Sequence, residues 1–135
     1  MKFNFGFGKE WAELKKFENL DQKEKKIVFY SENQNSWFIF ESLIKELINK
    51  YDISICYVTS SKDEPILKTE NKKIKTFFIG EGISRTQFFL NLKADILIMT
   101  MPDLEIFHIK KSKVYPVHYV YIFHAIASTH LVYQK

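Results

Sequence analysis

Short apolar runs alternate with amphipathic stretches over residues 26–135. Five runs rich in β-branched and aromatic residues predict buried strands at residues 27–30, 53–58, 76–79, 96–99 and 119–123. Apolar residues at helical spacing follow the first run over 37–48 and the third over about 84–93, whereas Pro65 limits the segment between the second and third runs to a short helix. This alternation predicts an α/β domain with a Rossmann-like, doubly wound parallel sheet of about five strands.

The first 25 residues have a different pattern. Trp11, Leu14, Phe17 and Leu20 recur every third residue in a segment rich in lysine and glutamate, which predicts an amphipathic extension and linker ahead of a domain over 26–135. One interpretation is an anchor in which residues 1–20 contact an anionic membrane surface. The other is a helix that packs on a neighbouring domain or on this domain's own surface. The mixture of acids and lysines favours packing, because lipid-binding faces are usually more one-sidedly basic.

Composition narrows the class of protein. A chain of 135 residues that is 46% hydrophobic, with only 4 Gly and 3 Pro, is expected to fold around one core. The net charge of +4 would admit nucleic acid as a partner, but Arg85 is the sole arginine and the lysines are scattered among 16 acidic residues. Because base and phosphate recognition favours arginine forks and a basic stripe, we expect no nucleic-acid partner.

Cysteine content and hydropathy indicate the cellular compartment in which the protein is expected. Cys56 is the one cysteine, so no internal disulfide can form, and its apolar surroundings predict a small buried side chain. The chain has neither a signal-peptide pattern at its N-terminus nor an uncharged stretch long enough to span a bilayer. A cytoplasmic protein is therefore expected.

Polar residues follow each predicted strand. Because parallel strands bring their carboxyl ends to one edge of a sheet, residues 31–36, 59–61, 80–84, 100–103 and 124–130 are expected to line one crevice. Their hydroxyls, amides and glycines suit a phosphorylated or polyhydroxylated ligand. The candidate substrate-binding residues are Ser31, Asn33, Asn35, Thr100, Asp103 and Ser128.

His124 follows the fifth apolar run and is the candidate catalytic base, because the pKa of histidine ordinarily lies near neutrality. The alternative is a histidine that is satisfied by hydrogen bonds in the core. His118 lies on the same face of that strand but about 20 Å away at its other end. His108 belongs to another segment without supporting carboxylates. No shared metal site is expected.

Three segments resemble a known family. ADILIMTMPDL at 94–104, FHIKKSK at 107–113 and VHYVYIFHAIASTHLVYQK at 117–135 are similar to the N-terminal domain of CDP-glycerol glycerophosphotransferase-like proteins, which are relatives of the teichoic-acid polymerases. The resemblance covers most of 26–135 in pattern and is most specific in the last forty or so residues. It implies a GT-B architecture in which this chain is the acceptor-side domain and the second, donor-binding domain lies outside it. The chain stops soon after the fifth predicted strand, and we expect the natural protein to continue.

The resemblance implies a transferase that moves glycerol phosphate from CDP-glycerol to an acceptor hydroxyl in cell-envelope polymer synthesis, at the inner face of the cell membrane. It implies no cofactor besides this donor. His124 occupies the place of the family's proposed base, but Ala125, Ile126 and Ala127 follow it where better-studied members have Gly, Thr and Pro. Two alternatives stay open, namely a GT-B nucleotide-sugar glycosyltransferase and a non-catalytic α/β interaction module. Because family members hold CDP mostly in the second domain, the isolated chain is expected to bind donor poorly.

Overall fold

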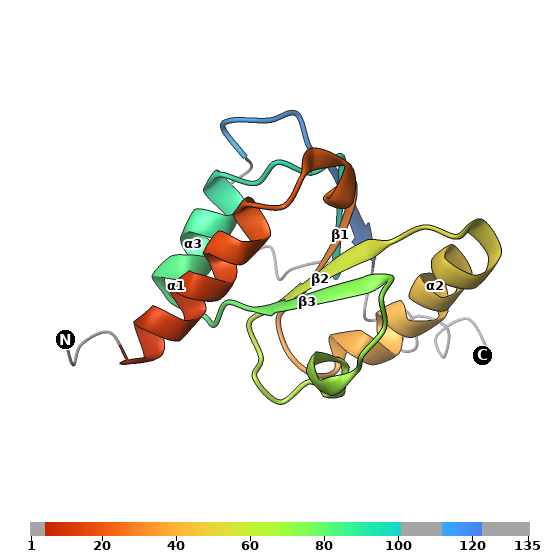
Figure 1. The fold of residues 1–135 in the computed structure, drawn as a ribbon, viewed down its shortest axis with the longest axis horizontal. Helices are drawn as coiled ribbons and strands as arrows, with labels where there is room; N and C mark the ends of the chain where they lie inside the picture. The colour runs from red at the N-terminus through yellow and green to blue at the C-terminus, as the bar shows by residue number, and fades with distance from the viewer. Residues whose placement is uncertain (1–4, 101–111, 123–135) are drawn as a thin grey trace, which may run out of the picture.

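A five-stranded, all-parallel sheet forms the centre of the molecule (Figure 1). The structure is a computed structural model and describes residues 5–100 and 112–122. The strands lie in the order β3-β2-β1-β4-β5. Their bounds are Ile27–Ser31 for β1, Ile55–Thr59 for β2, Ile74–Phe78 for β3, Ile96–Thr100 for β4 and His118–Ile122 for β5. The predicted α/β class and parallel sheet are confirmed.

Helices cover both faces of the sheet. Helices α1 (Phe5–Glu18) and α3 (Ile83–Leu90) lie side by side on one face (Figure 1). Helix α2 (Ser36–Tyr51) packs on the other face with the short 3-10 helix η3 (Pro65–Lys68). A second 3-10 turn, η2 (Gln22–Glu24), joins α1 to β1. Pro65 occupies the first turn of η3, where the missing N–H has no helical partner to lose.

The sheet has a hydrophobic core on each face, because side chains alternate between the two faces along each strand. Val28 and Tyr30 of β1 face α1 and α3, while Phe29 between them faces α2. Cys56 and Val58 of β2 alternate in the same way with Ile55 and Tyr57. Because a strand sends successive side chains to opposite faces, a strand covered on both sides needs an unbroken apolar run. This is the physical origin of the runs in the sequence.

Helix α1 belongs to the core of this domain. Leu14 and Phe17 are buried, and the Phe17 ring centroid lies 5.5 Å from that of Phe77 in β3 and 5.5 Å from that of Phe88 in α3. Packing on the domain's own surface is thus the alternative that the structure shows for this helix. Within residues 5–100 and 112–122, no helix combines the length and hydropathy needed to cross a bilayer.

The turn between β3 and α3 depends on Gly80. This residue has a φ of +70°, in the left-handed region that favours glycine, and the Glu10 carboxyl group of α1 occupies the space that a Cβ atom would need. Helix α3 begins with Gly82 as its N-cap. Serine is a common helix cap, but Ser84 lies inside the first turn and is buried.

Candidate ligand crevice at the carboxyl edge of the sheet

The order in which strands are added to the sheet switches sides between β1 and β4. From β1 the chain proceeds outward to β2 and β3, then crosses back to β4 on the other side of β1. In open α/β sheets, ligands bind outside the carboxyl ends of the strands at such a switch point. Ser31 pairs in register with Thr59, and Tyr30 pairs with Met99, which brings Thr100 beside Ser31. Ser31 and Thr100, predicted for the site, are therefore neighbours at this edge.

The loop from β1 into α2 presents two exposed amides. The Asn33 side-chain oxygen accepts a hydrogen bond from the Asn35 backbone N–H at 2.9 Å, which shapes the turn. Asn35 is the N-cap residue of α2, but its side chain makes no capping bond. Among the described residues, the Asn35 side-chain amide has no hydrogen-bond partner, while Asn33 is partly committed to the turn.

Helix α2 begins at this edge without a compensating charge. Its first turn contains no acidic residue, so the partial positive charge of the helix N-terminus is not offset there. Phe38, in the same turn, is 74% exposed. An anionic group would be favoured at the helix start, with an aromatic side chain beside it.

Glu64 anchors a closed cluster of hydroxyls at the ends of β1 and β2. Its carboxyl group is 1% exposed and accepts hydrogen bonds from Ser31, Thr59 and Tyr57, the last at 2.7 Å. Burial, followed by the neighbouring Glu64 carboxyl group, raises the pKa of the Tyr57 hydroxyl well above its usual value. The fully buried Ser31 hydroxyl, which also lies 2.8 Å from the Asn33 carbonyl oxygen, fixes the loop in this structure.

A second hydroxyl pair lies on the opposite face of the same strands. The Tyr30 and Ser60 hydroxyl oxygens are 2.5 Å apart, and the Tyr30 ring packs against Phe89 with centroids 4.8 Å apart. Burial raises the pKa of Tyr30 to about 12, although the Ser60 hydrogen bond and the positive charge of Arg85 act in the other direction. Arg85, in the first turn of α3, is half-buried and close enough to Tyr30 to act on its hydroxyl.

Three predicted site residues, His124, Asp103 and Ser128, lie outside the described residues. Strand β5 ends at Ile122, which pairs in register with Thr100. The described end of β5 is therefore level with the ends of the other strands, two residues before position 124. His118 is exposed at the opposite, amino end of β5.

The sequence did not predict the side-chain contacts of Glu64 and Arg85. Glu64 falls in a polar segment with no motif, and only the fold brings it to three hydroxyls. The glycines at 80–82 were a weak phosphate-binding signal, and the Glu10 carboxyl group that packs against Gly80 disfavours an anion there. Among the described residues, no three histidine, cysteine or acidic side chains come together to hold a metal ion.

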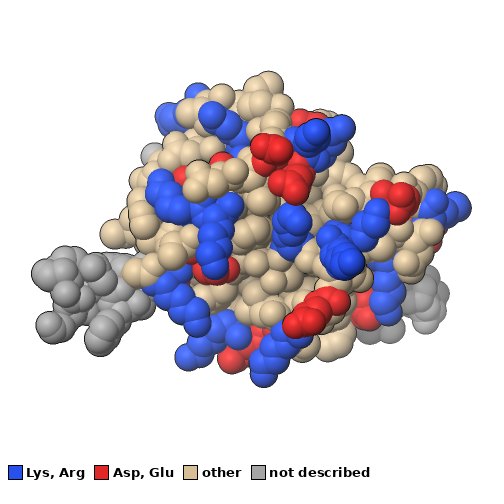
Figure 2. Space-filling view, in the orientation of Figure 1, with Lys and Arg blue, Asp and Glu red and all other residues tan. Residues whose placement is uncertain are grey.

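The visible surface has mixed charge. Figure 2 shows lysine and acidic side chains interspersed across this face, without a continuous basic stripe.

Comparison with known proteins gives no family assignment: no protein-family model matches the chain. No curated protein and no solved structure matches it either.

Proposed function

We propose that this chain is the acceptor-side part of a transferase that moves glycerol phosphate from CDP-glycerol to an acceptor hydroxyl, with His124 as the general base. The observation that carries the proposal is the switch-point edge, where the ends of β1, β4 and β5 are level. In the sequence, position 124 comes two residues after the end of β5. The family resemblance of residues 94–135 supplies the reaction.

The polar groups at this edge suit the acceptor side of such a reaction. Asn35 offers an uncommitted amide at the start of α2, and Thr100 adds a hydroxyl position next to the end of β1. Arg85 adds a positive charge on the α3 side of β1. These groups would orient a hydroxyl acceptor and a phosphate near each other. Proteins catalyse phosphoryl transfer mainly by such positioning and by electrostatic stabilisation.

The chemical step balances without a cofactor. The acceptor oxygen forms a bond to the β-phosphorus of CDP-glycerol, and its proton passes to His124. The bond between that phosphorus and the bridging oxygen breaks, and the oxygen leaves with the electron pair as part of CMP. The product is an acceptor that carries glycerol phosphate.

The identity of the donor substrate distinguishes this proposal from a nucleotide-sugar glycosyltransferase on the same scaffold. The full-length product of the reading frame that encodes this chain should be incubated with CDP-glycerol and, separately, with UDP- and GDP-sugars. We expect CMP release from CDP-glycerol that increases when a polyol or glycan acceptor is added. Release of a nucleoside diphosphate from a sugar donor alone would contradict the proposal, and no release from any donor would favour an interaction module.

Location at a membrane is a separate part of the proposal. Trp11 is 40% exposed on α1, and the Lys15 ammonium lies 4.7 Å from its ring centroid. Contact of residues 1–20 with the inner face of the cell membrane stays a prediction. Sedimentation of the chain with anionic vesicles, compared with a Trp11→Ser variant, tests it, because this side chain is exposed and its loss should leave the fold intact.

A further inference from the structure

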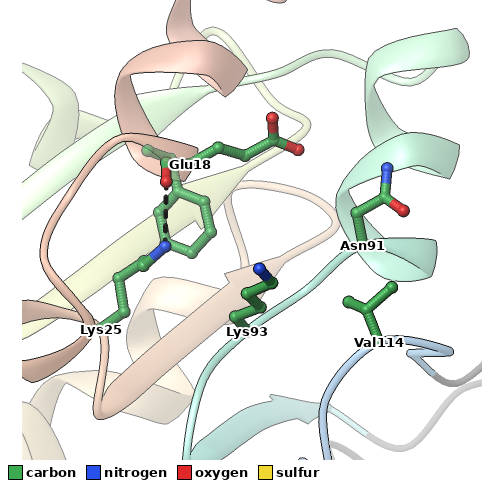
Figure 3. A pocket seen from close by; sticks show the side chains of 6 residues that line it. Glu18, Lys25, Asn91, Lys93 and Val114 are labelled. Carbon is green, nitrogen blue, oxygen red and sulfur yellow. Dashed lines mark hydrogen bonds between the residues drawn. The ribbon is translucent and has the colours of Figure 1, made fainter.

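We propose that a pocket at the amino edge of the sheet, opposite the carboxyl edge described above, binds a phosphate group. The pocket has a volume of about 280 Å³ and is lined by Phe17, Glu18, Lys25, Asn91, Lys93 and Val114 (Figure 3). A water molecule takes up about 30 Å³ of the liquid, so this space admits a phosphate group with room to spare.

Two ammonium groups, those of Lys25 and Lys93, line the pocket together with the Glu18 carboxyl group. Figure 3 shows the Lys25 and Lys93 side chains directed into the same space, while the Glu18 carboxyl group turns away from Lys25. That carboxyl group pairs instead with Lys15, at 3.0 Å. Neither Lys25 nor Lys93 forms an ion pair with any residue that the structure describes.

Lys25 is the unusual member of the pair because it is only 4% exposed. Its ammonium donates one hydrogen bond, to the Glu18 carbonyl oxygen at 3.1 Å, and lies 5.5 Å from the Phe17 ring centroid. An ammonium has three N–H donors, so two remain for a ligand. Burial, and then the charge of Lys93, lowers the pKa of Lys25, while the charges of Cys56 and Glu18 act in the opposite direction.

The helix ends explain how two lysines are held so close together. The carboxyl ends of α1 and α3 both border the pocket and attract cations. Each helix end supplies only about half a negative charge, against a full positive charge on each lysine. Since Glu18 is paired with Lys15, the two lysines and the two helix ends leave a net charge of about one positive unit. A phosphate group would complete this arrangement with charge-assisted hydrogen bonds.

The test is calorimetric titration of the chain with inorganic phosphate, at constant ionic strength set with sodium chloride. Lys93→Met is the informative variant because Lys93 is exposed and its loss should not prevent folding. We expect saturable binding to the wild type, at least tenfold weaker binding to Lys93→Met, and binding close to wild type in Lys93→Arg. Lys50→Met is the matched control, since that ammonium pairs with Glu46 on α2.

Absence of saturable binding to the wild type, or equal affinity in the wild type and Lys93→Met, would overturn the proposal. Phosphatidylcholine vesicles with and without phosphatidic acid identify the source of the phosphate group. Retention on the phosphatidic acid vesicles that is lost in Lys93→Met would support a lipid headgroup. Phosphate binding without vesicle retention would support a soluble phosphate compound.

Discussion

Two polar clusters at opposite edges of the sheet differ in whether their hydrogen bonds are complete. At the carboxyl edge, the buried Glu64 carboxyl group accepts three hydroxyl hydrogen bonds from its own chain. At the amino edge, the buried Lys25 ammonium has one acceptor and a second lysine nearby. Because burial is costly for polar groups without partners, the first cluster stabilises the fold by itself, whereas the second is suited to a ligand. The comparison separates a structural cluster from a binding site.

The largest expected effect follows from removing the buried acceptor of the closed cluster. Glu64→Ala removes the acceptor of three hydroxyls and should lower the free energy of unfolding by about 3–5 kcal/mol, because each buried donor left unpaired costs about 1–3 kcal/mol. Chemical denaturation measures the change. Glu70→Ala, an exposed glutamate in the same connection, is the control and should change stability by less than about 0.5 kcal/mol. Equal small effects would mean that the Glu64 cluster is not structural.

Alkaline pH should destabilise the carboxyl edge through the buried Tyr30, on the opposite face of the sheet from Glu64. The folded-state pKa of Tyr30 is raised to about 12 from an ordinary 10.0, so the unfolded chain loses the proton first as pH rises. The stability due to this group is therefore complete below pH 10 and is lost between about pH 10 and 12. The loss is on the order of 2–3 kcal/mol. Tyr30→Phe should reduce this pH dependence in denaturation curves, whereas Tyr51→Phe, with an exposed ring, should not.

Near neutral pH, Tyr30→Phe should have a smaller effect. The substitution removes the hydroxyl that lies 2.5 Å from the Ser60 hydroxyl but keeps the ring against Phe89. We expect a loss of about 1 kcal/mol, the usual net contribution of one hydrogen bond. Denaturant titration at pH 7 measures it. A loss above about 3 kcal/mol would mean that ring packing has changed as well.

The smallest expected effect is on the open pocket. Lys93→Met should change the free energy of unfolding by less than about 0.5 kcal/mol without phosphate, since Lys93 has no ion-pair partner among the described residues. Its removal also relieves the repulsion that lowers the pKa of Lys25. Thermal unfolding in chloride buffer measures the change. A large destabilisation would show that Lys93 supports the fold and is not reserved for a ligand.

The sequence predicted the fold well because strand patterns are local. The run at 96–99 became β4 at Ile96–Thr100, and the helix expected over 37–48 became α2 at Ser36–Tyr51. The candidate residues Ser31 and Thr100 were correctly expected at one edge, since parallel strands make this unavoidable. The hydrogen bond from the Ser31 hydroxyl to the buried Glu64 carboxyl group could not be predicted, because Glu64 comes from a loop 33 residues away with no motif.

The amino-edge pocket was equally hidden in the sequence. Lys25 belongs to a charged cluster that reads as solvated linker, and its burial depends on how Phe17 of α1 packs against β3 and α3. Composition and periodicity do not encode that contact. The packing of α1 thus determines both the core between α1, α3 and the sheet and the amino-edge pocket.

The most direct test of the proposed function compares His124 with His118, six residues earlier in the sequence. In the full-length protein, His124→Ala should lower CMP release from CDP-glycerol by about 10²–10⁴-fold, the usual contribution of a general base. His118→Ala, exposed at the amino end of β5, should leave it unchanged. Unchanged release in His124→Ala, or an equal loss in both variants, would contradict the assignment of the base to the carboxyl edge.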